Sequence, residues 1–179
     1  MSAEPSINVA WCTDPGSAEE LGRFFADNVT PEYISHSELQ GPRALDVGRW
    51  QPDIAGVFER EIATRVGRER GRIDAAAASY PVLAAHRDGR LVGLAFVSFF
   101  PDAPVPYGIV EDIVVERSGR SRGLGKQILD WITREALRSG CQRLFLESGV
   151  SNDDAHHFFE REGFSTCSIV MMKPLKPQD

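Results

Sequence analysis

The chain of 179 residues is long enough for one domain with a sizeable core, and hydrophobic residues make up 42% of it. Its formal net charge of −6 argues against a general nucleic-acid-binding protein, and its apolar runs are far too short to cross a membrane. The N-terminus has neither a basic start nor an apolar core, so we expect no secretory signal. Cys12, Cys141 and Cys167 form no metal-binding spacing and cannot all pair, which favours reduced thiols in a cytoplasm.

The N-terminal part of the chain predicts a strand followed by two amphipathic helices. The strand is expected at residues 7–12. Ser17 begins a capping-box pattern, Ser-Ala-Glu-Glu, at the start of the first helix. Pro52 marks the start of the second helix. Between the helices, residues 30–48 are punctuated by prolines and give no clear period.

From Pro81 onward the pattern becomes one of strands and helices in alternation. Two antiparallel strands, 82–86 and 91–99, flank an Asp-Gly turn. The elements expected after them are a strand at 107–115, a helix at 123–138, a strand at 143–147, a helix at 152–162 and a last strand at 164–172. We find no internal repeat and no second domain. The sequence therefore predicts one domain, residues 1–179, with a mixed α/β fold around a central sheet.

The most informative stretch is the loop that joins an apolar strand to the helix expected at 123–138. Gly123 and Gly125 bracket the junction, and Arg120 and Arg122 come just before it. Unpaired backbone N–H groups at the positive end of a helix form an anion site, and arginines add charge suited to phosphate. The loop therefore predicts a phosphorylated ligand.

Two common phosphate-binding loops do not fit this stretch. A nucleotide-triphosphate loop needs four residues between its first Gly and the Gly-Lys pair, then Ser or Thr. Here five residues separate Gly119 from Gly125, and Gln127 follows Lys126. The dinucleotide-binding fingerprint needs a third glycine where this chain has Ile128.

The pattern that remains is Val115, four residues, Arg120, two residues, Gly123, one residue and Gly125. It resembles the pyrophosphate loop of the GNAT superfamily, the acetyl-CoA-dependent N-acetyltransferases, and matches that loop at every anchor.

A second motif, in the right order and after the right intervening strand, resembles the next helix of that family. Asn152 would cap the helix, Gly163 would end it, and Phe159-Glu-Arg-Glu stands where the family has Tyr-Glu-Lys and one further residue. The resemblance covers residues 80–172 well and residues 1–79 loosely.

The resemblance implies a fold, a cosubstrate and a reaction. The fold is a central mixed, mostly antiparallel sheet flanked by helices, in which a splayed strand pair holds the CoA arm. The cosubstrate is acetyl-CoA, without a metal, and the acceptor is a primary amine of a small molecule. The implied cofactor-binding residues are Ile113, Val114, Val115, Arg120, Ser121, Arg122, Gly123, Leu124, Gly125, Lys126, Asn152 and Phe159.

Two other functions stay open. The chain could acetylate a protein or peptide, since residues 30–75 could form a substrate wall of either kind. It could also be a non-catalytic acyl-CoA-binding regulatory domain, because binding alone would keep the phosphate loop. A homodimer is compatible with the pattern as well.

Glu111 is the predicted general base, because it lies on the strand that should flank the thioester. Some small-molecule acetyltransferases of the family carry a similar Glu-Asp pair. Neighbouring strand residues face opposite sides, so Glu111 and Asp112 could point into one cleft only if the strand had a β-bulge. Alternatively, the carboxylate binds a substrate cation or a neighbouring backbone group. The resemblance implies that the backbone N–H of Val114 or Val115 stabilises the oxyanion.

Phe159 departs from the family pattern, which often has a Tyr there to protonate the departing thiolate. Phe has no proton to donate, so either the thiolate leaves unassisted or another group helps. The candidates are Tyr107, His156, His157 and Cys167. The two adjacent histidines would diverge by about 100 degrees on a helix, unlike the ligands of a zinc helix, so no metal site is expected.

Overall fold

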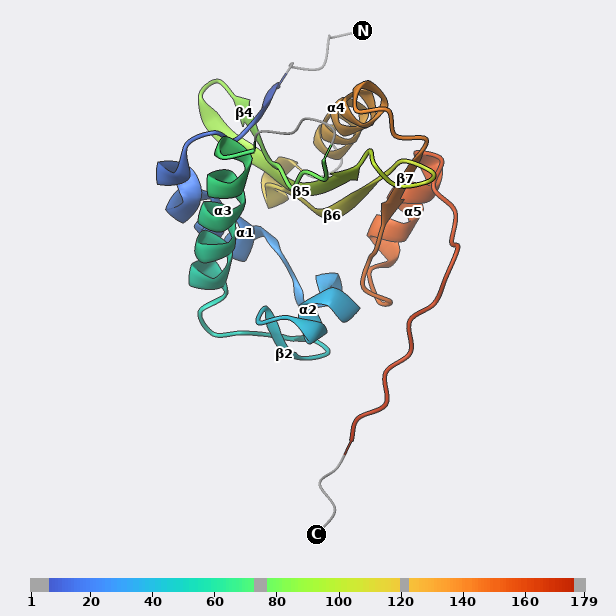
Figure 1. Cartoon of the computed structure of the whole chain (residues 1–179). Helices are drawn as coiled ribbons and strands as arrows, with labels where there is room; N and C mark the ends of the chain where they lie inside the picture. The colour runs from blue at the N-terminus through green and yellow to red at the C-terminus, as the bar shows by residue number, and fades with distance from the viewer. Residues whose placement is uncertain (1–6, 73–76, 120–122, 176–179) are drawn as a thin grey trace, which may run out of the picture.

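Five strands form the central sheet in the order β1-β4-β5-β6-β7 (Figure 1). The computed structural model describes residues 7–72, 77–119 and 123–175. The strands are β1 at Asn8–Trp11, β4 at Val82–Arg87, β5 at Arg90–Phe100, β6 at Tyr107–Val115 and β7 at Arg143–Leu146. Only β6 and β7 pair in parallel; the other neighbours are antiparallel. The predicted mixed, mostly antiparallel sheet is confirmed.

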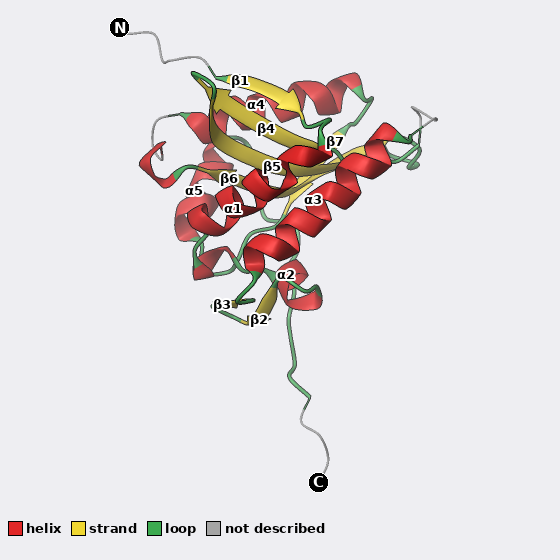
Figure 2. Ribbon diagram, turned by 90° about the vertical axis from the view of Figure 1, so that its left-hand side faces the viewer, coloured by secondary structure: helices red, strands yellow, loops and turns green. Residues whose placement is uncertain are grey.

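Two pairs of helices cover the two faces of this sheet (Figure 2). One face carries α1 at Ala18–Asn28 and α3 at Ile54–Arg70, and the other carries α4 at Leu124–Arg138 and α5 at Asp153–Arg161. The helices α1 and α3 can approach closely because Gly22 lacks a side chain; a Cβ there would lie 2.6 Å from the Ala55 carbonyl oxygen.

A hydrophobic cluster lies on each side of the sheet. Phe25 and Phe58 stack with ring centroids 3.5 Å apart under α1 and α3, and both are fully buried. On the other side, the apolar face of α4 packs on alternate residues of β5, among them Ala95 and Val97. Burying these side chains is the main favourable term in the stability of the domain.

The segment that the sequence left unassigned crosses the open end of the sheet. It contains a 3₁₀ turn at Pro31–Tyr33, the short helix α2 at His36–Gln40, and a small hairpin of β2 at Ala44–Asp46 and β3 at Arg49–Trp50. Gly149, after β7, lies against this segment so closely that a Cβ would overlap the Glu32 carbonyl oxygen. The segment is therefore held against the loop between β7 and α5.

Two local predictions are wrong, and a third holds in position alone: Asn152 is the N-cap residue of α5, but its side chain makes no capping hydrogen bond. The Ser17 side chain does not cap α1; its hydroxyl donates to the Asp14 carbonyl oxygen at 2.7 Å, because a 3₁₀ turn at Pro15–Ser17 precedes the helix. Residues 164–172 form no strand, and beyond Phe164 they run exposed, away from the sheet (Figure 1). An apolar segment becomes a strand only where another strand pairs with it, and the described residues provide none there.

No helix in the described parts of the chain is both long and apolar enough to span a membrane.

Candidate active site

The strands β6 and β7 separate partway along their length. Their parallel pairing runs from Tyr107 opposite Arg143 to Val110 opposite Leu146. Beyond Val110, β6 continues to Val115 without β7 as a neighbour. The last residues of β6 therefore have one edge that pairs with β5 and one edge free to bind a ligand.

A cavity of about 830 Å³ lies at this free edge. Four parts of the chain line it. Strand β6 contributes Glu111, Ile113, Val114 and Val115, and the start of α4 contributes Gly123, Leu124, Gly125 and Lys126. Asn152, Ala155, His157, Phe158 and Phe159 come from α5 and the residues before it, and Tyr33, Ser35 and Glu38 come from the crossing segment. We call the part beside α4 and α5 the cofactor end. The part lined by Tyr33, Ser35, Glu38, Glu111, Glu147 and Ser148 is the acceptor end.

At the cofactor end, the α4 N-terminus points backbone N–H groups toward the cavity. Gly123 is the N-cap residue with φ of 73°, a left-handed conformation that favours glycine. A Cβ on Gly125 would lie 3.3 Å from the Phe158 ring, so this glycine lets α5 pack against the helix start. The first N–H groups of a helix have no intrahelical partner, so this end suits an anion. Arg120, Ser121 and Arg122, which were predicted to bind the same anion, lie outside the described residues.

A β-bulge at Glu111 sets the direction of the β6 side chains. Phe96 pairs with Asp112 and Val97 with Val110, which leaves Glu111 as an extra residue. Glu111 reaches Ser98 on β5 and Arg65 on α3, and Asp112 reaches Arg43 beneath the same helix. The bulge that the sequence required for both carboxylates to share a side is thus present.

The backbone of β6 presents alternate amides to the cavity. The N–H of Glu116 donates to the Val92 oxygen of β5 at 3.0 Å. Directions alternate along a strand, so the N–H groups of Val115 and Ile113 face the free edge, and that of Val114 faces β5. Of the two predicted oxyanion donors, only Val115 therefore aims its N–H at the cavity.

Tyr33, from the crossing segment, occupies the other free amide. Its hydroxyl accepts the Ile113 N–H at 3.2 Å and donates to Asp112 Oδ1 at 2.9 Å. Burial, with Asp112 and Glu38 close by, raises the pKa of Tyr33 well above its ordinary value of 10. The hydroxyl therefore keeps its proton and joins the bulge of β6 to the acceptor end.

Asp112 is held by an arginine that the sequence did not single out. Arg43 Nη1 lies 3.0 Å from both Asp112 Oδ2 and Glu38 Oε1, while its Nη2 reaches Glu61 at 2.8 Å. Asp112 is 1% exposed, and its burial raises its pKa from 3.8 to about 6, although Arg43 opposes that shift. Desolvation thus outweighs the ion pair for this carboxyl group.

Glu111 lies at the surface of the cavity, unlike Asp112. One carboxylate oxygen accepts from the Ser98 hydroxyl and the other from the Arg65 guanidinium. Each oxygen keeps a second lone pair, so the carboxylate can also accept an N–H from a bound amine.

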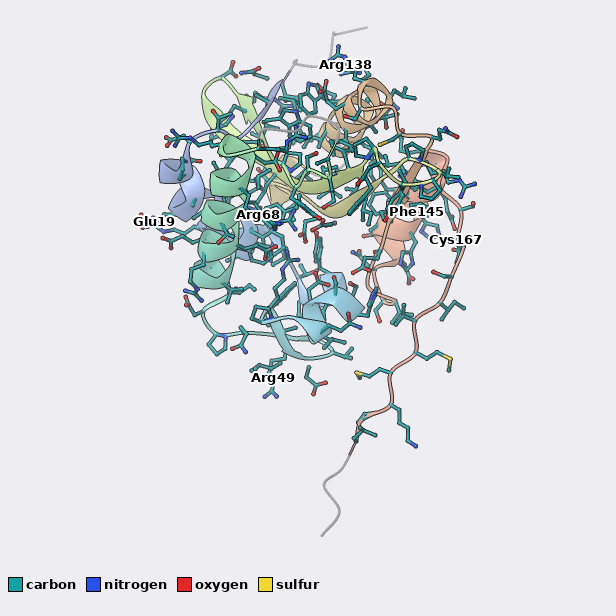
Figure 3. The ribbon with its side chains drawn as sticks, viewed as in Figure 1. Glu19, Arg49, Arg68, Arg138, Phe145 and Cys167 are labelled. Atoms are coloured by element: carbon teal, nitrogen blue, oxygen red, sulfur yellow. The ribbon has the colours of Figure 1, made fainter. Side chains whose placement is uncertain are left out.

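The candidate proton donors that could replace a tyrosine at position 159 differ in their distance from the cavity lining. Phe159 is 8% exposed and packs between Phe158 and Phe164 while lining the cavity. His157 lines the cavity as well. Tyr107 stacks on Phe100 away from the cavity lining. Figure 3 shows Cys167 on the segment beyond α5, where it is exposed.

Glu147, directly after the strand beside that of Glu111, completes the acceptor end. It follows Leu146, the last residue of β7 that pairs with β6, as Glu111 follows Val110. Its carboxylate lies 2.7 Å from the Ser35 hydroxyl, which lies equally close to Glu38, and 3.1 Å from His36 Nδ1. In the described parts of the chain, no group of three or more His, Cys, Asp and Glu side chains could hold a metal ion.

Comparison with known proteins identifies the family. Residues 49–164 match the model of the acetyltransferase (GNAT) family, which is more than half of the chain. The chain belongs to the GNAT acetyltransferase family. The solved structure of an aminoglycoside N-acetyltransferase in complex with CoA superposes with a TM-score of 0.63 over 99% of each chain. At 16% sequence identity, this likeness shows the fold alone.

Two named relatives of this GNAT protein act on phosphorus-containing amines. The aminoalkylphosphonate N-acetyltransferase of Salmonella typhimurium is 31% identical over 38% of this chain and 44% of its own length. The glucosamine 6-phosphate N-acetyltransferase of Arabidopsis thaliana is 33% identical over 37% of this chain and 42% of its own. The match thus spans less than half the length of either relative.

The raised pKa of Asp112 predicts a pH dependence of stability. The folded protein holds this proton more tightly than the unfolded chain, so the group's contribution to stability is largest below pH 3.8 and is lost as the pH rises to about 6. We expect the free energy of unfolding of the native protein, minus that of Asp112→Asn, to fall across this window in urea titrations. Asp102→Asn, which removes an exposed carboxylate, should show no such trend. A flat Asp112→Asn difference would show that burial does not control this proton.

Proposed function

We propose that this protein is an N-acetyltransferase that moves an acetyl group from acetyl-CoA to a primary amine of a small molecule. The free edge of β6, facing a cavity that ends at the α4 N-terminus, is the observation that carries the proposal. A strand edge suits an extended arm with amide groups, and a helix N-terminus suits a pyrophosphate. Acetyl-CoA, the family's cosubstrate, combines both features.

In this proposal, different residues along the cavity bind different parts of acetyl-CoA. Gly123, Leu124, Gly125 and Lys126 bind the pyrophosphate with their backbone N–H groups, and Asn152 and Phe159 form the opposite wall. Val115 pairs with the arm. Ile113 lies nearer the point where β6 and β7 part, so its N–H, now bonded to Tyr33, is the second candidate donor to the oxyanion.

The reaction joins the amine to the thioester directly. The amine nitrogen attacks the carbonyl carbon, a C–N bond forms, the C–S bond breaks, and the sulfur leaves with the electron pair as a thiolate. Glu111 takes the proton that the nitrogen loses, directly or through a water molecule. Holding both substrates in one cavity supplies much of the rate, because it replaces a bimolecular encounter.

A non-catalytic acyl-CoA-binding domain is the second candidate, and Phe159 favours it because it cannot protonate the thiolate. Release of free CoA thiol, measured with a panel of amines, separates the two functions. Catalysis predicts amine-dependent release; a binding domain predicts acetyl-CoA binding without release.

Gly123→Asp should abolish binding of CoA and acetyl-CoA. The substitution puts a carboxylate and a Cβ where the pyrophosphate approaches the backbone. Ligand at 100 times its dissociation constant stabilises a protein by about 2.7 kcal/mol, so the native protein should melt at a higher temperature with CoA. Gly140→Asp is the matched control, since Gly140 has a similar φ of 78° at the far end of α4. A normal CoA shift in folded Gly123→Asp would place the phosphates elsewhere.

Glu111→Gln should lower kcat by about two to four orders of magnitude if Glu111 is the base. Gln can still accept hydrogen bonds from Ser98 and from the amine, but it cannot take a proton. The affinity for acetyl-CoA should be unchanged, and the acidic limb of the pH–rate profile should shift. If Glu111 only binds a substrate cation, KM should rise while kcat largely survives. Unchanged kcat, KM and pH profile would remove Glu111 from the active site.

A further inference from the structure

The acceptor end carries more negative charge than its neighbouring cations neutralise. The carboxylates at this end and directly behind it are Glu38, Glu61, Glu111, Asp112 and Glu147. Two guanidinium groups, Arg43 and Arg65, pair with the first four of them. By formal charge, five carboxylates face two guanidinium groups, which leaves three negative charges in excess. A cationic substrate would be attracted here.

Glu147 is the least compensated of these carboxylates. Its partners are the Ser35 hydroxyl and His36, while the arginines pair with the other four. The Ser35 hydroxyl also lies 2.7 Å from Glu38 Oε2, the same distance that separates it from Glu147 Oε1. A hydroxyl has one proton, so it cannot donate to both carboxylates at once.

Ser148, in the same part of the cavity lining, has a hydroxyl without a partner among the described residues. The residue lines the acceptor end, and its Oγ is buried. Buried hydroxyl groups are normally hydrogen-bonded. An ammonium group has three N–H donors, and one bound beside Glu147 could satisfy both Glu147 and Ser148.

The position of Glu147 distinguishes it from Glu111, the group proposed to meet the attacking nitrogen. Glu111 and Glu147 are the first residues beyond the last β6–β7 pair, one on each of the two separating segments, and both line the cavity. An amine whose reacting nitrogen lies beside Glu111 can therefore extend the rest of its chain toward Glu147 at the end of the neighbouring strand. A second ammonium on that chain meets Glu147.

Among the described residues, the acceptor end has no comparable partner for phosphate. The basic side chains that line the described part of the cavity are Lys126, His157 and Arg161, all at the cofactor end. Arg43 and Arg65 point at carboxylates. A phosphonate or sugar phosphate, as in the named substrates of the two relatives, would face Glu147 and Glu111 without a cation.

We infer that the acceptor is an amine with at least two positive charges and no phosphate, and that Glu147 binds its second ammonium. The inference rests on the proposed N-acetyltransferase function and adds the substrate class.

Initial rates with matched amines test the inference on the native protein. At saturating acetyl-CoA, kcat/KM for 1,4-diaminobutane should exceed that for butylamine by at least about tenfold, because a charge-assisted hydrogen bond is worth about 1.5–3 kcal/mol. The value for 3-aminopropylphosphonate should be lower than that for butylamine.

Glu147→Gln should remove most of the diamine preference, mainly through KM, and leave the CoA-induced melting shift unchanged. Glu19→Gln removes an exposed carboxylate on α1 and should keep the preference. If kcat/KM for butylamine or for the aminophosphonate equals that for the diamine, the inference is wrong while the acetyltransferase function stands. If no amine releases CoA, the proposed function itself fails. A diamine preference that survives Glu147→Gln in a folded protein would overturn the role of Glu147.

Discussion

Strand β6 carries one residue more than β5 can pair with, between Val110 and Asp112, and the geometry of the cavity depends on it. Without this bulge, strand alternation would place Val110 and Ile113 on opposite faces of the sheet. In the structure both pack against the cluster beneath α4. The bulge thus keeps the end of β6 in the core while it turns two carboxylates toward α3. The pairing of β6 with β7 also ends at Val110, so one edge of β6 beyond this residue is free to bind a ligand.

Arg43 and Arg65, which pair with the carboxylates of the bulge, contribute more to the orientation of these groups than to the stability of the fold. A buried ion pair recovers little beyond the cost of removing its charges from water, and the raised pKa of Asp112 shows that this cost is incompletely recovered. The same pairs orient Asp112, which fixes Tyr33 against the Ile113 amide. Fixed polar groups around a reacting centre are the usual structural basis of acyl-transfer catalysis.

The residues that the sequence singled out and that line the cavity are mostly close together in the chain. The strand, the two glycines and the helix start lie within one short stretch, and the Glu-Asp pair required a bulge on steric grounds alone. Tyr33 and Arg43 could not be found in this way, because they are 79 and 69 residues from Asp112 and no local period marks them. The sequence signal in their segment is a capping box, Ser35 with Glu38 three residues later. In the structure the Glu38 carboxylate accepts the Ser35 N–H. The strand expected at 164–172 failed because strand pairing depends on a neighbour that the pattern cannot specify.

Exchange of single backbone amides with deuterium tests most directly whether the free edge of β6 binds the acyl-CoA arm. In the free protein, the Val115 N–H should exchange quickly, while the Glu116 N–H, bonded to Val92, should exchange slowly. Saturating CoA should slow exchange at Val115 and leave Glu116 unchanged, because the arm would take the place of the missing strand. Unaltered exchange at Val115 with CoA bound would contradict the account, since the arm would then lie elsewhere.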